Sequence, residues 1–125
     1  MPVLVADALR KEYGGVVALD DFSVSVEAGE LLALVGHNGS GKSTFLRLVA
    51  GLLEPTDGVL VVANAPAGSM HARAEVSFVP DQPVLYDDLS VNEHIEYLSR
   101  LFGEPDWPER ADTLLELLGL TARAD

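Results

Sequence analysis

The sequence predicts an α/β fold, because strand-like apolar segments fill the first third of the chain and helical patterns fill the last third. Between them, a glycine-rich loop follows an apolar run and precedes an amphipathic segment. The chain has 125 residues, of which 48% are apolar and 22% are charged. These values are typical of one folded domain rather than of a disordered chain.

The first strands are separated by turn signals. Residues 3–8 carry the first apolar positions, and Gly14-Gly15 marks a turn. Residues 16–26 then alternate loosely between apolar and polar side chains, which is the pattern of a half-buried strand. After a second turn at residues 28–30, the continuous apolar run from Leu31 to Val35 predicts a strand that is covered on both faces.

The loop from Gly36 to Ser43 matches the pattern G-x-x-x-x-G-K-[ST] without a mismatch. Glycines at these positions let successive backbone N–H groups point toward a bound phosphate, and the following helix adds the positive end of its dipole. Lys42 supplies a mobile positive charge for the β and γ phosphates, and the Ser43 hydroxyl can ligate Mg²⁺. The pattern therefore predicts a P-loop NTPase core.

A helix is expected after this loop, with an apolar stripe from Phe45 to Leu52. The segment from Glu54 to Gly58 ends it, because proline cannot continue a helix and glycine suits a turn. Short apolar runs at residues 59–62 and 76–79 predict two further strands.

The last third of the chain predicts two helices. Ser90 and Glu93 form an S-x-x-E capping box, in which each side chain accepts a hydrogen bond from an otherwise unpaired backbone N–H. The apolar positions between Val91 and Phe102 share one helix face, and Gly103 ends that helix. A second apolar stripe follows between Pro108 and Leu118.

The chain is strongly acidic, with 20 Asp and Glu residues against 8 Lys and Arg and a formal net charge of −12. Residues 1–80 carry 9 acids and 5 bases (net −4), and residues 81–125 carry 11 acids and 3 bases (net −8). Such a surface repels nucleic-acid backbones and anionic lipids, so we expect no nucleic-acid partner. Any phosphate must be bound locally, around Lys42.

Other classes of site are excluded by what the sequence lacks. There is no cysteine, which excludes disulfides and thiolate chemistry. The three histidines, His37, His71 and His94, share no metal-like spacing. No signal peptide is visible, and no apolar run approaches the roughly 18 residues of a membrane span. We therefore expect a cytoplasmic protein.

The nine residues from Gly36 to Thr44 resemble the G-x-N-G-x-G-K-[ST]-T form typical of ATP-binding cassette (ABC) proteins. Flanking segments resemble the same family over essentially the whole chain: residues 13–15, 18–22, 50–58, 78–83 and 89–93. The resemblance implies a partial ABC nucleotide-binding domain over residues 1–125. Residues 1–80 would form an antiparallel β subdomain and a P-loop core with an incomplete sheet. Residues 81–125 would form the Q-loop and the start of an α-helical subdomain.

The resemblance further implies that the chain binds ATP and Mg²⁺. The nucleotide-binding residues that it carries over are Tyr13, Gly36, His37, Asn38, Gly39, Ser40, Gly41, Lys42, Ser43 and Thr44. Tyr13 corresponds to the family's aromatic residue that stacks on adenine, a contact that discriminates only mildly against GTP. Val16 or Val17 is a further candidate for contact with the base or the ribose.

The Q-loop departs from the family pattern. A glutamine commonly follows the strand and proline there, where it contacts Mg²⁺ and the attacking water. In this chain Asp81 follows Pro80, and Gln82 comes one residue later. Amide and carboxylate oxygens are both suitable ligands for Mg²⁺. We therefore expect Gln82 or Asp81 to act with Ser43 as a metal-binding residue.

Several family elements needed for hydrolysis do not occur within these residues. No apolar run after Lys42 ends in Asp-Glu, and no Ser-Gly-Gly signature is present. We expect no catalytic residue within this chain, a general base beyond Asp125, and a fragment truncated just before the signature motif. Phosphoryl transfer depends on positioning and charge neutralisation, so the isolated chain should bind Mg²⁺-ATP but hydrolyse it negligibly.

The resemblance implies that the parent protein is the ATP-hydrolysing subunit of an ABC transporter. It would form a head-to-tail dimer with a second nucleotide-binding subunit and bind a transmembrane permease, and so lie at the inner face of the membrane. The alternatives are a non-transport ABC protein and a non-catalytic ATP-binding remnant or regulatory module. The transported substrate and the direction of transport are properties of the membrane partner.

Overall fold

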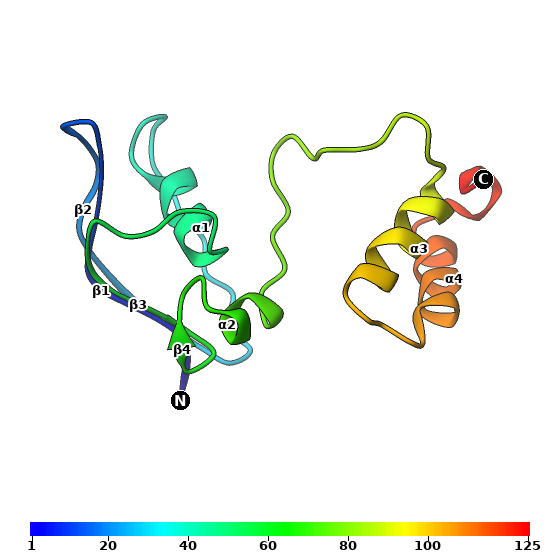
Figure 1. Cartoon of the computed structure of the whole chain (residues 1–125), viewed down its shortest axis with the longest axis horizontal. Coiled ribbons are helices and arrows are strands. Elements are labelled where there is room, and N and C mark those ends of the chain that lie inside the picture. The colour runs from blue at the N-terminus through cyan, green and yellow to red at the C-terminus, as the bar shows by residue number, and fades with distance from the viewer. The chain divides into compact units, whose positions relative to one another are not determined.

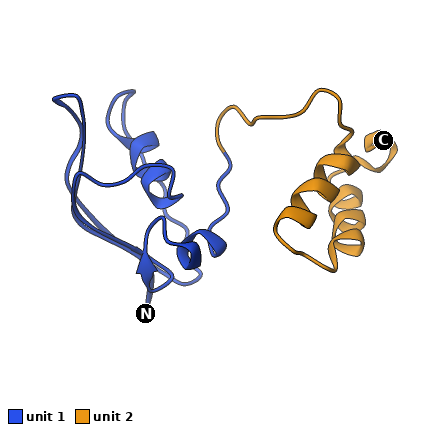
Figure 2. Ribbon diagram, in the orientation of Figure 1, with its two compact units in different colours: residues 1–79 blue, residues 80–125 orange.

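The computed structural model describes all 125 residues and divides into two compact units. Unit 1 comprises Met1–Val79, and unit 2 comprises Pro80–Asp125 (Figure 2). Unit 1 contains every strand and the phosphate loop, whereas unit 2 is helical.

Unit 1 is built on a four-stranded antiparallel sheet with the strand order β2-β1-β3-β4 (Figure 1). Its strands are β1 (Pro2–Tyr13), β2 (Val16–Glu27), β3 (Asp57–Val62) and β4 (Ala65–Pro66). The turn between β1 and β2 requires glycine, because Gly14 and Gly15 have φ angles of +52° and +87°. β1 pairs with both of its neighbours and lies between them.

The helix α1 (Lys42–Val49) packs on one face of this sheet. Its two buried side chains, Phe45 and Leu48, meet apolar residues of the strands. The Phe45 ring lies 4.8 Å from the ring of Phe22, measured between centroids. Side chains of α1 and of the strands form the core of unit 1. Its buried members are Ala6, Leu9, Leu19, Phe45, Leu48 and Leu60.

α1 is shorter than its apolar stripe predicts. The helix ends at Val49, where Ala50 is the C-cap and Gly51 takes a φ of +76°. Leu52 therefore lies beyond the helix. A short helix that the sequence pattern did not predict, α2 (Met70–Ala74), follows β4 and begins at Ser69, whose side chain accepts a hydrogen bond from the N–H of Ala72.

Two of the predicted strands are wrong. Leu31 to Val35 and Val76 to Val79 form no strand. Leu31 is 97% exposed and Val35 is 92% exposed. An apolar run becomes a strand only where another strand supplies hydrogen-bonding partners. Neither segment pairs with the sheet of unit 1.

Unit 2 consists of α3 (Val91–Leu101), α4 (Trp107–Leu117) and the 3₁₀ helix η1 (Thr121–Arg123). The predicted capping box is confirmed: the Glu93 N–H donates to the Ser90 hydroxyl at 3.2 Å, and the Ser90 N–H donates to the Glu93 carboxylate at 2.7 Å. Trp107 begins α4, and Pro108 lies in its first turn, where a missing N–H costs no helical hydrogen bond.

His94 of α3 is hydrogen-bonded to the segment that precedes this helix. Its Nε2 accepts a 2.9 Å hydrogen bond from the backbone N–H of Tyr86, and its Nδ1 lies 2.8 Å from the carbonyl oxygen of Ser90. A backbone N–H can only donate, so Nε2 carries no proton and Nδ1–H is the donor to Ser90. The Tyr86 ring also meets Tyr97 edge-on, with 5.9 Å between centroids.

The predicted fold class is confirmed in its main features. The chain has an antiparallel N-terminal sheet, a helix directly after the phosphate loop and a helical last third. None of its helices has the length and apolar character needed to cross a lipid bilayer.

The packing of α1 predicts different effects for two leucines on the same helix. Leu48 is fully buried, whereas Leu46 is 45% exposed. Leu48→Ala leaves a cavity in the core, so we expect the free energy of unfolding to fall by about 2–5 kcal/mol. Leu46→Ala is the matched control and should cost less than about 1 kcal/mol. Urea denaturation followed by circular dichroism measures both; equal losses would contradict this packing.

Candidate functional site

The predicted phosphate loop surrounds a small pocket in unit 1. Its volume is about 210 Å³. The lining residues are Ala18, Asn38, Gly39, Ser40, Gly41, Lys42, Ser43 and Thr44. Most of the loop therefore faces one space, and Ala18 of β2 closes it. Lys42 is the one charged residue in this lining, so the pocket is locally positive although the chain is acidic.

The start of α1 gives this pocket unpaired hydrogen-bond donors. No side chain caps the helix, and its first turn contains no acidic residue. The first N–H groups of an α-helix have no partner within the helix, and they form the positive end of its dipole. Lys42, Ser43 and Thr44 are the first three residues of α1 and also line the pocket. This arrangement is suited to a phosphate or another anion.

The ammonium group of Lys42 lies within the loop itself. Its Nζ donates hydrogen bonds to the carbonyl oxygens of Gly36 and His37, the second at 2.9 Å, and lies 3.2 Å from the Ser40 hydroxyl oxygen. Gly36 and His37 are outside the pocket lining, and they act on the site by holding this charge. These contacts hold the ammonium group of Lys42 against the loop.

Close approach makes glycine necessary at one position of the loop and favourable at another. Gly41 has a φ of +96°, and a methyl group there would lie 2.6 Å from the backbone oxygen of Ala18. A methyl group at Gly36 would lie 2.6 Å from the Ser40 hydroxyl oxygen. Gly41 thus lets the loop lie directly against β2.

The other predicted loop residues have distinct surroundings. Ser43 lines the pocket and is exposed, so its hydroxyl is accessible to a ligand. Asn38 and Thr44 line the same pocket. The ring of His37 is exposed, and its Nδ1 donates to the carbonyl oxygen of Asn38 at 2.8 Å.

Tyr13 lies at the end of β1 and does not line the loop pocket. Its side chain is accessible, with 42% of the residue exposed, as are those of Val16 and Val17 at the start of β2. The Nζ of Lys11 lies 5.2 Å from the centroid of the Tyr13 ring. Unit 1 therefore carries both the phosphate loop and an exposed aromatic ring.

Asp81 and Gln82 belong to unit 2 and lie in an exposed bend directly after Pro80. Both residues are exposed, so their side-chain oxygen atoms are accessible to a ligand. No group of three or more His, Asp or Glu residues is placed to hold a metal ion. The chain by itself therefore offers no preformed carboxylate metal centre.

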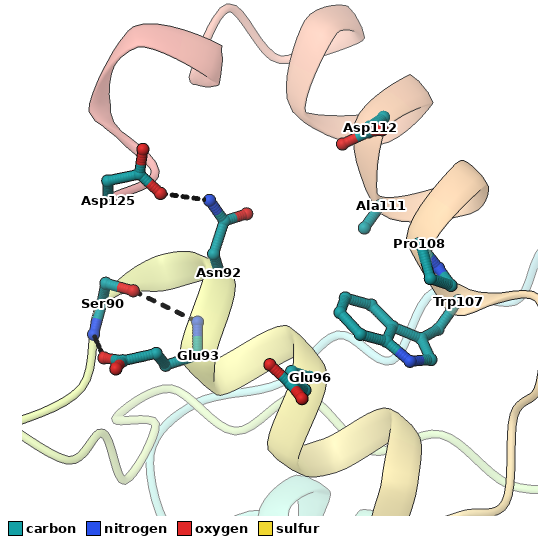
Figure 3. A pocket seen from close by; sticks show the side chains of 9 residues that line it. All are labelled: Ser90, Asn92, Glu93, Glu96, Trp107, Pro108, Ala111, Asp112 and Asp125. Carbon is teal, nitrogen blue, oxygen red and sulfur yellow. Dashed lines mark hydrogen bonds between the residues drawn. The ribbon is translucent and has the colours of Figure 1, made fainter.

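A larger pocket of about 580 Å³ lies in unit 2 (Figure 3). Its lining residues are Ser90, Asn92, Glu93, Glu96, Trp107, Pro108, Ala111, Asp112 and Asp125. Glu93 already caps α3, and Asp125 accepts a 2.7 Å hydrogen bond from the Asn92 side chain (Figure 3). The lining contains four carboxylates and no cation, so this pocket repels phosphate despite its size.

Two residues at the site were not singled out by the sequence. Ala18 contributes its backbone to the loop pocket, and Lys11 contacts Tyr13. No property of an alanine side chain signals such a backbone contact. For Lys11 the available signal is its spacing, because residues two apart on a strand share one face.

Comparison with known proteins gives a consistent family match. A family model described as ABC transporter matches residues 19–125. The chain is 33% identical over 127 residues to the SkfA peptide export ATP-binding protein SkfE of Bacillus subtilis (strain 168), covering 100% of this chain and 53% of that protein. It is 36% identical over 128 residues to the Nod factor export ATP-binding protein I of Ralstonia nicotianae, covering 99% and 40%.

Solved structures agree with this match. A structure described as the ATP binding subunit of an ABC transporter has a TM-score of 0.89 and 29% sequence identity, covering 98% of this chain and 52% of that one. cbiO1 from Clostridium perfringens, part of the ABC transporter complex cbiONQ, has a TM-score of 0.79 and 27% identity, covering 99% and 53%. The chain spans about half the length, or less, of the curated relatives named above.

The close approach of Gly41 to β2 predicts that Gly41→Ala weakens anion binding. The added methyl group clashes with the Ala18 carbonyl and forces an alanine into a left-handed conformation. We expect the affinity for inorganic tripolyphosphate, measured by isothermal titration calorimetry, to fall at least about tenfold, which corresponds to roughly 1.4 kcal/mol. Gly103→Ala is the matched control, because Gly103 also has a positive φ but has open space around it and lies in unit 2. Unchanged binding in Gly41→Ala would contradict this geometry.

Proposed function

The chain belongs to the ABC transporter family, and we propose that it is the part of a transporter ATPase that binds Mg²⁺-ATP. The observation that carries the proposal is the loop pocket, where an uncapped helix start, a glycine backbone and Lys42 converge. This combination supplies several donors and one positive charge to a phosphate chain, and no carboxylate opposes it.

Different groups of the loop bind different parts of the triphosphate. The backbone N–H groups of Lys42, Ser43 and Thr44 bind phosphate oxygens, and the Lys42 side chain neutralises charge on the β and γ phosphates. To do so, its ammonium group exchanges loop carbonyl oxygens for phosphate oxygens. Asn38 and Ser40 shape the pocket wall, and the carbonyl oxygens of Gly36 and His37 hold the ammonium group until phosphate replaces them.

We assign the adenine base to residues outside the loop, and the metal ion to Ser43 of the loop and the Q-loop segment. The exposed ring of Tyr13 stacks on adenine, and Val16 or Val17 contacts the base or the ribose. For Mg²⁺, the Ser43 hydroxyl at the loop pocket is one hard-oxygen donor, and Gln82 or Asp81 of the Q-loop segment offers another. When bound, the ion neutralises charge on the phosphates. The protein's own contribution is to present these oxygens at the loop and in the Q-loop segment.

Residues 1–80 form the nucleotide-binding β and P-loop part, and residues 81–125 form the Q-loop and the start of the helical subdomain. The division of the chain into compact units after Val79 supports this assignment. No Asp-Glu pair follows an apolar run after Lys42, and no Ser-Gly-Gly is present within the 125 residues. We place the general base and the signature motif of the proposed ATPase outside these residues.

The partners of the proposed subunit are a second nucleotide-binding subunit, in a head-to-tail dimer, and a transmembrane permease. Matched relatives are described as ATP-binding proteins of export and import systems, which supports a transport role. The permease places the chain at the cytoplasmic, inner face of the membrane. The net charge of −12 favours such indirect attachment, because an acidic surface is repelled by anionic lipids.

The proposed function predicts that Lys42→Ala lowers the affinity for Mg²⁺-ATP by about 10- to 100-fold. Removing a charged hydrogen-bond donor costs about 1.5–3 kcal/mol. Arg47→Ala is the matched control, because Arg47 is an exposed cation on the same helix but does not line the pocket. Isothermal titration calorimetry measures both affinities.

The same chain should hydrolyse ATP negligibly, since it lacks a residue placed to polarise the attacking water. Phosphate release by the purified 125-residue chain measures this rate. Steady turnover that disappears in Lys42→Ala would contradict the assignment of the general base to residues outside the chain.

A further inference from the structure

Lys11 makes two contacts that the phosphate-binding motif does not require. Its side chain is half-buried near the end of β1, and its Nζ lies 5.2 Å from the centroid of the Tyr13 ring. The same Nζ donates a 2.7 Å hydrogen bond to the backbone carbonyl oxygen of Glu54. The ammonium group is therefore held at a fixed place against one face of the ring.

The charge of Lys11 is not neutralised by a carboxylate. None of the five ion pairs in the chain includes it. The neighbouring Arg10, by contrast, is paired with Glu12 at 2.8 Å and with Asp20 at 3.2 Å. An unpaired ammonium group is attracted to the electron-rich face of an aromatic ring. The contact between Lys11 and the Tyr13 ring is therefore one that depends on the charge of Lys11.

The hydrogen bond from Lys11 to Glu54 connects the end of β1 to the segment that follows α1. Two further hydrogen bonds join the same parts of unit 1: the Thr56 N–H donates to the carbonyl oxygen of Arg10, and the Glu12 N–H donates to the Thr56 hydroxyl, both at 2.9 Å. Because α1 begins at the phosphate loop, the end of β1 is tied to the element that carries that loop. Three hydrogen bonds thus hold the end of β1, where Tyr13 lies, against the segment after α1.

We infer that Lys11 is a positioning residue for nucleobase recognition, which fixes one face of Tyr13 so that the opposite face receives the base. The inference rests on the proposed function of Tyr13 and adds a determinant to it. A ring that is already oriented loses less freedom when it stacks, so Lys11 increases affinity through preorganisation. Lys11 does not line the phosphate pocket, so its effect is confined to ligands that carry a base.

The test compares Mg²⁺-ATP with inorganic tripolyphosphate, which has the phosphates but no base, by isothermal titration calorimetry on the 125-residue chain. Lys11→Met keeps the length of the side chain and removes its charge. We expect it to weaken ATP binding about two- to fivefold, as for an exposed cation–π contact. Tripolyphosphate binding should not change. An equal loss for both ligands would overturn the inference, because it would show a general effect on folding or charge.

Two other variants separate the contribution of the Lys11 charge to ATP affinity from the contribution of its hydrogen bond to Glu54. Lys11→Gln retains an N–H donor for Glu54 but has no charge, and it should lose ATP affinity as Lys11→Met does. Lys11→Arg keeps a cation that can lie over the ring, and it should restore most of the loss. Full ATP affinity in Lys11→Gln would overturn the role of the charge.

A double-mutant cycle with Tyr13→Ala completes the test. If Lys11 acts through the ring, Lys11→Met causes no further loss in the Tyr13→Ala background. Additive losses would overturn the inference. If Tyr13→Ala binds ATP as tightly as the unaltered chain, while Lys42→Ala does not, the proposed base contact fails and Lys11 loses its role with it. If Lys42→Ala also binds ATP normally, the proposed function itself fails.

Discussion

The burial of Phe45 and Leu48 against one face of the sheet determines where the phosphate loop lies. These side chains hold α1 to the strands, and the loop is the segment that leads into α1. A helix of eight residues is rigid, so fixing its buried face also fixes the direction of its first N–H groups. Gly41 then brings the loop into contact with Ala18 of β2. The polar site is thus positioned by apolar packing.

This arrangement would allow a strongly acidic chain to hold a polyanion. Interactions between exposed charges are largely screened beyond about 8 Å at physiological ionic strength, so the charges that line a pocket matter more than the net charge of the chain. Within the loop pocket, a bound phosphate would meet backbone N–H groups, the start of a helix and Lys42 at short range. The larger pocket in unit 2 shows the opposite balance, because Glu93, Glu96, Asp112 and Asp125 surround it. The hydrogen-bond donors and charges that line a pocket therefore decide whether it suits an anion, and the volume of the pocket does not.

Features that depend on neighbouring residues could be predicted from the sequence, and features that depend on distant strands could not. The capping box at Ser90 and Glu93, the glycine turn after Tyr13 and the helix after Lys42 are local, and all three are present. The run from Leu31 to Val35 is as apolar as a buried strand, but its conformation depends on a partner strand that unit 1 does not provide. The contact between Gly41 and Ala18 likewise joins two elements whose sequences carry no sign of it.

The proposed contacts with the two ends of the nucleotide rest on different physics. The phosphate end relies on charge and on aligned N–H groups, which respond to ionic strength and to the placement of Lys42. The base end relies on an aromatic face, whose energy comes mainly from apolar contact and depends little on salt. Both are carried by unit 1, where the hydrogen bonds of Glu54 and Thr56 join the end of β1 to the segment after α1. A single sheet-and-helix framework therefore sets the spacing between two binding surfaces that can vary independently in strength.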